Sequence, residues 1–342
     1  MKNKIFIRAD ANKNIGMGHI MRCITVAHAL KDVDCIFLVS DYESYKIIND
    51  NDLEGICLNS NYNNLLISEV KKIIKIGREN YVNSILVDSY YVTKEYLEEL
   101  KKYFYVGCFN CSNNYLPADY IINYNINCDR KIYKNLYKAS KTKLLLGSSY
   151  VPLREEFLAK HKEVTNKAVQ QILVMTGGSD PYNFMGQFVE KICTLQECKR
   201  IRFVFISGPY NANRENLIEK VNKIKNMEVQ NNVKNISTIM QNSDLVISAG
   251  GTTLYELCAI GVPAIVFAFA ENQIEEARFM GEKMIVKYVG QYGEEKFWNN
   301  VRNAILDLIK SSPTRRKMGE EMKKAVDGKG AYRIAECIKD YF

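Results

Sequence analysis

Features that would place this 342-residue sequence in several common classes are scarce or missing. No apolar run approaches the ~18 residues that a membrane-spanning helix needs, so stable membrane insertion is not expected. Strand-like sequence starts at Lys4, so we expect no signal peptide and a cytoplasmic location. Lys and Arg are spread along the chain without a stripe of interleaved aromatics, so nucleic-acid binding is not predicted.

Metal-ligating residues are also sparse. The chain has three histidines, and among its ten cysteines Cys108 and Cys111 form a lone CxxC with Cys128 downstream. Because a structural zinc site takes four ligands and no fourth lies at a suitable spacing, we predict no metal site and no cofactor. The scattered cysteines indicate free thiols in a reducing compartment rather than a disulfide framework. The net charge of +8 is typical of a solvated surface, and it also favours the approach of an anionic substrate.

The sequence is rich in short β-prone runs that alternate with amphipathic stretches from end to end. Such alternation predicts parallel sheets with helices on both faces, and its two series predict two Rossmann-like, doubly wound α/β domains that face a cleft. In the first half, strands are expected at 4–9, 35–39, 55–59, 84–88, 103–108 and 120–124, and helices at 18–31, 64–78 and 93–102. In the second half, strands are expected at 171–176, 202–207, 227–230, 244–248, 264–268 and 284–288, and helices at 183–194, 212–225, 251–261 and 272–282.

The domain boundaries follow from composition. We expect a first domain over 1–157, a polar linker over 158–168 and a second domain over 169–325. Helical apolar spacing continues after residue 311, so 326–342 is expected to form a helix that packs back on the first domain. The chain is expected to be a monomer or a weak dimer.

The loop after the first strand carries the candidate catalytic residue. Ligands of open α/β sheets bind beyond the carboxyl ends of the strands, where this chain has Asp10 to His19 with Gly16 and Gly18 in the turn. A histidine at a helix N-terminus is kept neutral by the helix dipole, so His19 is suited to act as a general base. The alternative is a histidine that only caps or packs its helix. The loop matches neither the GxGxxG dinucleotide pattern nor a Walker loop.

Two further loops pair glycines after an apolar strand. One contains Gly177, Gly178 and Ser179, and its backbone amides and hydroxyl suit an anion, although a simple turn with a helix cap explains it equally well. The other contains Gly250, Gly251, Thr252 and Thr253, with Glu256 one helical turn further on. Its hydroxyls suit phosphate oxygens, and its carboxylate can accept hydrogen bonds from a ribose diol. Together these loops predict a nucleoside diphosphate site in the second domain.

Four longer motifs resemble one family. They are RADANKNIGMGHIMRC at the start, LLLGSSYVPLREEF at 144–157, ILVMTGGSDPYN, and SDLVISAGGTTLYELCAIGVPAIVFAFAENQ. The chain is similar over most of its length to the UDP-2,4-diacetamido-2,4,6-trideoxy-β-L-altropyranose hydrolases of pseudaminic acid biosynthesis, a nonulosonic acid route. That family shares the two-domain GT-B architecture of the peptidoglycan glycosyltransferase that makes lipid II.

The resemblance implies that the chain releases UDP from C1 of its sugar by hydrolysis, without a metal. It implies that His19 activates or positions water and that Glu256 binds the ribose. Further contacts to sugar or diphosphate are implied for residues of both domains: Asp10, Gly16, Gly18, Asp88, Tyr90, Tyr150, Arg154, Asn272 and Gln273.

The sequence departs from the family pattern on the expected sugar side. The Asp-His-Tyr motif of the fourth strand is Asp88-Ser89-Tyr90, an acidic pair after the fifth strand is Phe109-Asn110, and an Asp-Gln-Asn stretch is Asn123-Tyr124-Asn125. Two alternatives therefore stay open. One is a GT-B glycosyltransferase in which an acceptor hydroxyl replaces water, and the other is a nucleotide-sugar binding protein that has lost catalysis.

Overall fold

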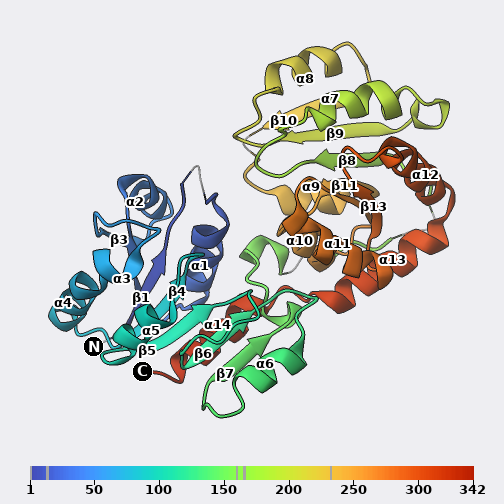
Figure 1. Cartoon of the computed structure of the whole chain (residues 1–342). Coiled ribbons are helices and arrows are strands. Elements are labelled where there is room, and N and C mark those ends of the chain that lie inside the picture. The colour runs from blue at the N-terminus through green and yellow to red at the C-terminus, as the bar shows by residue number, and fades with distance from the viewer. Residues whose placement is uncertain (1, 13–14, 159–160, 165–166, 232) are drawn as a thin grey trace. The chain divides into compact units, whose positions relative to one another are not determined.

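The computed structural model describes residues 2–12, 15–158, 161–164, 167–231 and 233–342 (Figure 1). The chain divides into two compact units. The first comprises Met1–Arg154 together with Gly328–Phe342, and the second comprises Glu155–Asp327. Each unit is built around its own parallel sheet, as the two series of alternating elements predict.

The first unit contains a seven-stranded parallel sheet in the order β3-β2-β1-β4-β5-β6-β7. Its strands are β1 (Asn3–Ala9), β2 (Val33–Val39), β3 (Glu54–Cys57), β4 (Ser84–Asp88), β5 (Tyr105–Phe109), β6 (Tyr120–Asn123) and β7 (Lys143–Leu146). Its helices are α1 (Gly18–Ala29), α2 (Tyr42–Asn49), α3 (Leu65–Ser68), α4 (Val70–Asn80), α5 (Lys94–Lys101), α6 (Arg130–Leu136) and α14 (Gly330–Lys339). The chain winds outward in both directions from β1 and β4, which defines a doubly wound sheet.

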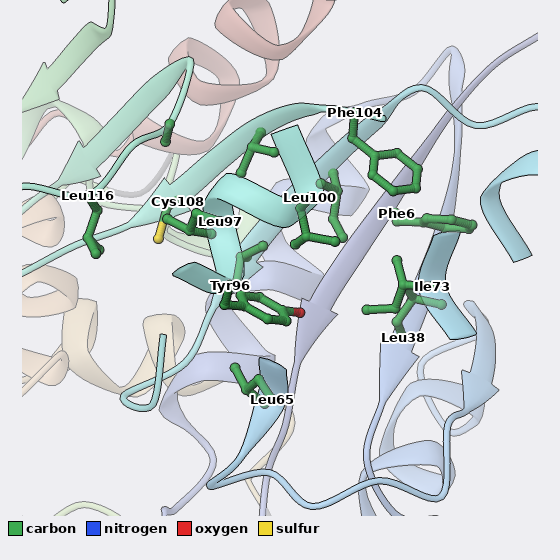
Figure 2. Close-up of a cluster of buried hydrophobic side chains, with 14 of the residues drawn as sticks. Phe6, Leu38, Leu65, Ile73, Tyr96, Leu97, Leu100, Phe104, Cys108 and Leu116 are labelled. Atoms are coloured by element: carbon green, nitrogen blue, oxygen red, sulfur yellow. The ribbon is translucent and has the colours of Figure 1, made fainter. Parts of the chain in front are cut away.

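A hydrophobic core joins this sheet to α3, α4, α5 and α6, and Figure 2 shows part of it. Phe6 of β1 packs against Phe104, with ring centroids 6.0 Å apart, and both lie beside Ile73 of α4. Strand β4 is buried along its whole length, which is typical of a parallel strand covered on both faces. The core therefore fixes the carboxyl end of β4, where Asp88 lies.

The second unit contains a six-stranded parallel sheet in the order β10-β9-β8-β11-β12-β13. Its strands are β8 (Gln171–Met175), β9 (Arg202–Ser207), β10 (Met227–Asn231), β11 (Leu245–Ala249), β12 (Ala264–Ala268) and β13 (Lys287–Gln291). Its helices are α7 (Phe184–Phe188), continued by a π-helical turn to Cys193, α8 (Arg214–Val221), α9 (Ile236–Asn242), α10 (Thr253–Ile260), α11 (Glu271–Glu282), α12 (Phe297–Lys310) and α13 (Ser312–Ala325). This arrangement confirms two doubly wound α/β units.

Some elements differ from those expected. Strand β7 and helices α2, α6, α9 and α12 were not expected, and β13 begins three residues later than the run that starts at 284 suggested. The reason for the shift is local. Ile285 donates its amide to the carbonyl of Met280, so residues up to this point close the end of α11 before the strand begins.

The C-terminal helix α14 belongs to the first unit. The chain leaves α13 after Ala325 and turns at Gly328, whose φ is +75°. Gly330 then meets the backbone of Val151 so closely that a Cβ would lie 2.1 Å from its carbonyl oxygen, so only glycine fits. Near the other end of the helix, Lys143 of β7 pairs with Asp340 at 2.8 Å.

All ten cysteines are free thiols. No helix among the described residues is both long and apolar enough to cross a membrane.

Candidate functional site

Each sheet has one switch point, from which the chain winds in opposite directions. It lies between β1 and β4 in the first sheet and between β8 and β11 in the second. Open α/β sheets bind ligands beyond the carboxyl ends of the strands at such points. His19 lies at the start of α1, directly after the loop that follows β1, and Tyr90 lies in the loop that follows β4. The loops that follow β8 and β11 carry the two glycine pairs. Most of the residues predicted from the sequence therefore lie at a switch point.

The loop after β1 turns sharply before α1. The amide of Gly16 donates to the carbonyl of Asn12 at 2.8 Å, and Gly16 has φ +73°, in the left-handed region. Residues 13 and 14 lie outside the described part of the chain. Helix α1 then begins at Gly18, and no side chain caps its N-terminus. Gly16 and Gly18 are both exposed, with no atom within 4 Å of a Cβ built at either position, so the backbone is open to a ligand here.

His19 is the second residue of α1, and its side chain is only 5% exposed. Its Nε2 lies 3.8 Å from Oδ1 of Asp88, at the end of β4. The ring of Tyr90 meets the imidazole edge to face, with centroids 4.2 Å apart, although Tyr90 itself is 71% exposed. The structure thus brings His19 together with Asp88 and Tyr90, which lie up to 71 positions further along the chain. They meet because β1, which precedes His19, pairs with β4, which ends at Asp88.

The charge state of His19 follows from this setting. Burial lowers the pKa of His19 below its usual 6.5, and the positive charge of Arg22 adds to this effect, whereas Asp88 and Asp10 oppose it. A neutral imidazole near pH 7 is what a general base requires. The neutral state agrees with the prediction from the sequence. Its main cause is desolvation in the fold, rather than the helix dipole that the sequence suggested.

Arg22 is a member of this cluster that the sequence analysis did not select. Its Nε and Nη2 donate to the two carboxylate oxygens of Asp88, which form a bidentate ion pair. Its Nη1 donates to the hydroxyl of Tyr124 at 2.8 Å. The spacing between His19 and Arg22 was a usable signal, because residues three apart lie on the same face of a helix. The partner, Asp88, could only be found from the fold.

Asp10 has a structural setting. One oxygen accepts from Nη1 of Arg8 at 2.6 Å and the other from the amide of Ser40 at 2.7 Å. Arg8 is fully buried and also donates to both oxygens of Glu69, which accepts a further hydrogen bond from the hydroxyl of Tyr96. Both carboxylate oxygens of Asp10 are hydrogen-bonded within the protein, and the residue is only 2% exposed. Asp10 therefore holds the end of β1 in place.

The three departures from the family pattern share one role in the structure. Ser89, Asn110 and Asn123 follow or end β4, β5 and β6. In each, the side-chain oxygen accepts a hydrogen bond from the amide two residues further on, at 3.2, 3.1 and 3.0 Å respectively. Such bonds form the tight turns that end a strand. These side chains therefore shape the loops at the carboxyl edge of the first sheet.

In the second unit, the loop after β8 leaves Gly177, Gly178 and Ser179 exposed. The amides at the start of α7 are not available to a ligand, because those of Phe184 and Met185 donate to the carboxylate of Asp180 at 2.7 and 3.0 Å. Here the structure differs from the expected anion site at a helix start. Any phosphate bound at this loop would have only the loop amides and the Ser179 hydroxyl as donors.

In the loop after β11, Thr252 is the N-cap residue of α10, and no side chain caps the helix. Backbone carbonyls take two amides of this turn: Leu254 donates to Gly251 at 3.0 Å and Tyr255 donates to Thr252 at 3.1 Å. Gly251 has φ +125°, which favours glycine, and no atom lies within 4 Å of a Cβ built there. Glu256 lies in the first turn of α10 and is partly buried. The open backbone at Gly251 and the hydroxyls of Thr252 and Thr253 are what this loop offers to an anionic ligand.

Helix α11 packs against this loop. A Cβ on Gly250 would lie 3.0 Å from Cβ of Gln273, so the glycine allows α11 to approach β11. Oε1 of Gln273 accepts from the amide of Phe269 at 2.8 Å, which fixes this side chain at the end of β12. Asn272 is in the first turn of α11, and its side chain lies outside what the structure describes.

Tyr150 lies elsewhere in the first unit. It follows β7, which is three strands away from β4 at the edge of the sheet. There it lines a cavity of about 430 Å³ together with Ser149, Leu144, Leu146 and three basic residues, Arg130, Lys134 and Arg333. Arg154, the last residue of the first segment of this unit, is partly buried. The structure therefore does not group Tyr150 with His19 within the first unit.

No group of three or more His, Cys, Asp and Glu side chains suited to a metal ion occurs in the part of the chain that the structure describes. Each unit has its own candidate groups: carboxylates and the imidazole of His19 in the first, and backbone amides, hydroxyls and the carboxylate of Glu256 in the second. The first set can accept a proton, and the second can donate hydrogen bonds to an anion.

Two doubly wound parallel-sheet units define the GT-B class of folds. In agreement, the family model described as "Glycosyltransferase family 28 C-terminal domain" matches residues 172–337. The fold is similar to that of MurG from Acinetobacter baumannii, with a TM-score of 0.72 over 99% of this chain and 100% of that one. Because the sequence identity is 13%, this likeness concerns the fold alone.

Three curated relatives share more sequence. An uncharacterized protein of Methanocaldococcus jannaschii, MJ1062, is 27% identical over 80% of this chain, and the match spans 57% of that longer protein. The spore coat polysaccharide biosynthesis protein SpsG of Bacillus subtilis is 24% identical over 98% of both chains. The UDP-2,4-diacetamido-2,4,6-trideoxy-beta-L-altropyranose hydrolase of Campylobacter jejuni is 22% identical over 82% of this chain and 97% of its own.

Proposed function

We propose that this chain hydrolyses a UDP-linked 2,4-diacetamido-2,4,6-trideoxyhexose and releases UDP and the free sugar. The observation that carries the proposal is the buried, neutral His19 beside Asp88 at the switch point of the first sheet. The similarity to the hydrolase from Campylobacter jejuni supports the choice of substrate class.

The proposed reaction needs one proton acceptor. A water oxygen attacks C1 of the sugar and its proton passes to the imidazole of His19, while the bond between C1 and the phosphate oxygen breaks and its electron pair leaves with UDP. The imidazolium formed in this step lies 3.8 Å from a carboxylate oxygen of Asp88, which offsets its charge. Tyr90 offers an exposed aromatic ring beside the imidazole, and we assign it to the sugar.

The second unit binds the leaving group in this proposal. The uncapped start of α10, with Gly250, Gly251 and the hydroxyls of Thr252 and Thr253, holds the diphosphate, and Glu256 accepts from the ribose. Oriented amides stabilise the charge that develops on UDP as the bond breaks. Gly177, Gly178, Ser179, Asn272 and Gln273 are assigned to the same ligand as secondary contacts.

Glycosyl transfer is the second candidate, and the description of the matching family model favours it. The two reactions differ only in whether water or an acceptor hydroxyl attacks C1. The third candidate is a nucleotide-sugar binding protein that has lost catalysis. The buried, neutral imidazole of His19 at the switch point of the first sheet speaks against it, because a proton acceptor is what the reaction needs.

UDP release from a panel of UDP-linked diacetamido-trideoxyhexoses, with no acceptor present, tests the proposal. Hydrolysis predicts stoichiometric UDP and free sugar from at least one member of the panel. Release that begins only after an acceptor is added would support the transferase. Binding of UDP without release of UDP from any UDP-sugar, with or without an acceptor, would support a binding protein that has lost catalysis.

A further inference from the structure

The ion pair between Arg22 and Asp88 is held on several sides. Both donors of the guanidinium edge meet both oxygens of the carboxylate, and Asp88 is 1% exposed. The thiol of Cys23 lies 3.5 Å from Oδ2 of the same carboxylate. Asp88 therefore has little freedom to rotate toward any other partner.

Aromatic rings fix the guanidinium in turn. The Arg22 guanidinium carbon lies 4.9 Å from the ring centroid of Phe109 and 5.5 Å from that of Tyr124, and the two rings meet edge to face with centroids 6.2 Å apart. Tyr124 also accepts a hydrogen bond from Nη1. These rings come from the ends of β5 and β6, so three elements converge on one arginine.

This clamp has a consequence for His19. The carboxylate of Asp88, whose two oxygens accept from Arg22, lies 3.8 Å from Nε2 of His19, beyond hydrogen-bond distance. The charged and titratable groups that face the imidazole are Asp88 from β4, Arg22 from α1, Asp10 after β1 and Tyr90 after β4. Asp10 is itself paired with Arg8. The arginine thus decides how much negative charge the imidazole experiences.

We propose that Arg22 is a positioning residue that acts on His19 through Asp88. It holds the carboxylate near the imidazole and offsets part of the negative charge that the buried imidazole experiences. This role rests on the proposed function insofar as His19 is the base. Phe109 and Tyr124 keep the guanidinium in place.

A buried ion pair of this kind is not explained by stability. Desolvation of both charges offsets their attraction, so apolar replacements of similar volume are often neutral or stabilising. A role next to the candidate base gives the pair a purpose.

The test is a titration of the histidine ring protons by NMR on the full chain, which has only three histidines. His19→Gln assigns the signal of His19. In Arg22→Met, Asp88 loses its counter-charge, so the titration midpoint of His19 should rise by about one pH unit. Arg22→Lys keeps the positive charge but cannot make both hydrogen bonds to Asp88, so its His19 midpoint should rise by less. The double variant Arg22→Met/Asp88→Asn should show no rise.

Arg78→Met is the matched control. Arg78 lies over the ring of Tyr103 at 5.1 Å, on α4 of the same unit, and should leave the His19 midpoint unchanged. An unchanged midpoint in folded Arg22→Met, or an equal rise in Arg78→Met, would overturn the proposal. If Arg22→Met does not fold, Arg22→Lys and Tyr124→Phe decide the matter, because both should still give a small rise and the absence of any rise in both contradicts the proposal.

The titration does not depend on turnover, so its outcome is separable from that of the proposed function. If UDP-sugars are hydrolysed, the acid limb of kcat/KM should also move to higher pH in Arg22→Met by the same amount as the midpoint. A merely structural role would lower activity or stability without moving either.

Discussion

Nε2 of His19 and Oδ1 of Asp88 lie 3.8 Å apart, close enough for their charges to interact but too far for a hydrogen bond. Both oxygens of Asp88 accept hydrogen bonds from Arg22. The distance of 3.8 Å distinguishes this pair from one in which the imidazole donates a hydrogen bond directly to a carboxylate, which would raise the basicity of the ring. The buried imidazole is therefore neutral at rest, and it interacts strongly with the carboxylate only once it is protonated.

Removal of the imidazole should abolish catalysis but not nucleotide binding. We expect His19→Ala to lose ~10²-fold or more in kcat, the usual contribution of a general base, with an unchanged Kd for UDP. His28→Ala is the control, because His28 is exposed on the same helix. Stopped assays of UDP release and calorimetry measure the two quantities. Full activity of His19→Ala would remove His19 from its assigned role.

The pH profile should report the neutral imidazole. Because burial lowers the pKa of His19, the base is active above that pKa, and kcat/KM should be level near pH 7 to 8. On the acid side it should fall tenfold per pH unit, with an apparent pKa below 6.5. The limb should vanish from the residual activity of His19→Ala. Activity that rises toward acid pH would contradict a general base and favour a general acid.

Glu256 should matter for the nucleotide alone. We expect Glu256→Ala to weaken UDP binding by roughly 10- to 100-fold, as for the loss of hydrogen bonds to a charged group. Glu275→Ala is the control, since Glu275 is an exposed carboxylate on the neighbouring helix α11. Isothermal calorimetry with UDP measures both. Equal affinities of Glu256→Ala and the parent chain would exclude the ribose contact.

A buried carboxyl in the second unit should make stability depend on pH. Burial raises the pKa of Glu276 to about 7, although a hydrogen bond from the Tyr255 hydroxyl partly offsets this. The folded chain therefore holds a proton that the unfolded chain releases above 4.5. Stability is thus lost as the pH rises from 4.5 to about 7, by on the order of 1–3 kcal/mol.

Glu276→Gln should remove this loss, because the amide stays neutral and can still accept from Tyr255. Urea unfolding at pH 5 and pH 8 measures the difference, and Glu275→Gln serves as the exposed control. The same pH dependence in Glu276→Gln as in the parent chain would show that another group carries it.

The fold and the candidate loops could be predicted largely from local pattern. Parallel strands buried on both faces, such as β4, read as apolar runs, and glycine pairs after such runs mark the loops at the switch points. Some short elements were not predicted, because a few residues carry too little periodic pattern to identify a strand or a helix. β7 offers only Lys143–Leu146, and α6 spans only Arg130–Leu136.

Side-chain partnerships could not be predicted, because they join distant parts of the chain. Arg22 and Asp88 are 66 positions apart and meet only since β1 pairs with β4. Likewise, the pattern of Gly177, Gly178 and Ser179 suits an anion at a helix start, but in the fold the carboxylate of Asp180 accepts from the first amides of α7. The neutral state of His19 was anticipated, yet its main cause, burial at the switch point, required the structure.

Hydrolysis in ¹⁸O-labelled water tests the central claim most directly. The released sugar and UDP from the active UDP-linked diacetamido-trideoxyhexose would be analysed separately by mass spectrometry. Attack of water at C1 predicts one ¹⁸O on the sugar and none on UDP. Label on UDP instead would place the attack at phosphorus, and the absence of free sugar without an added acceptor would contradict hydrolysis altogether.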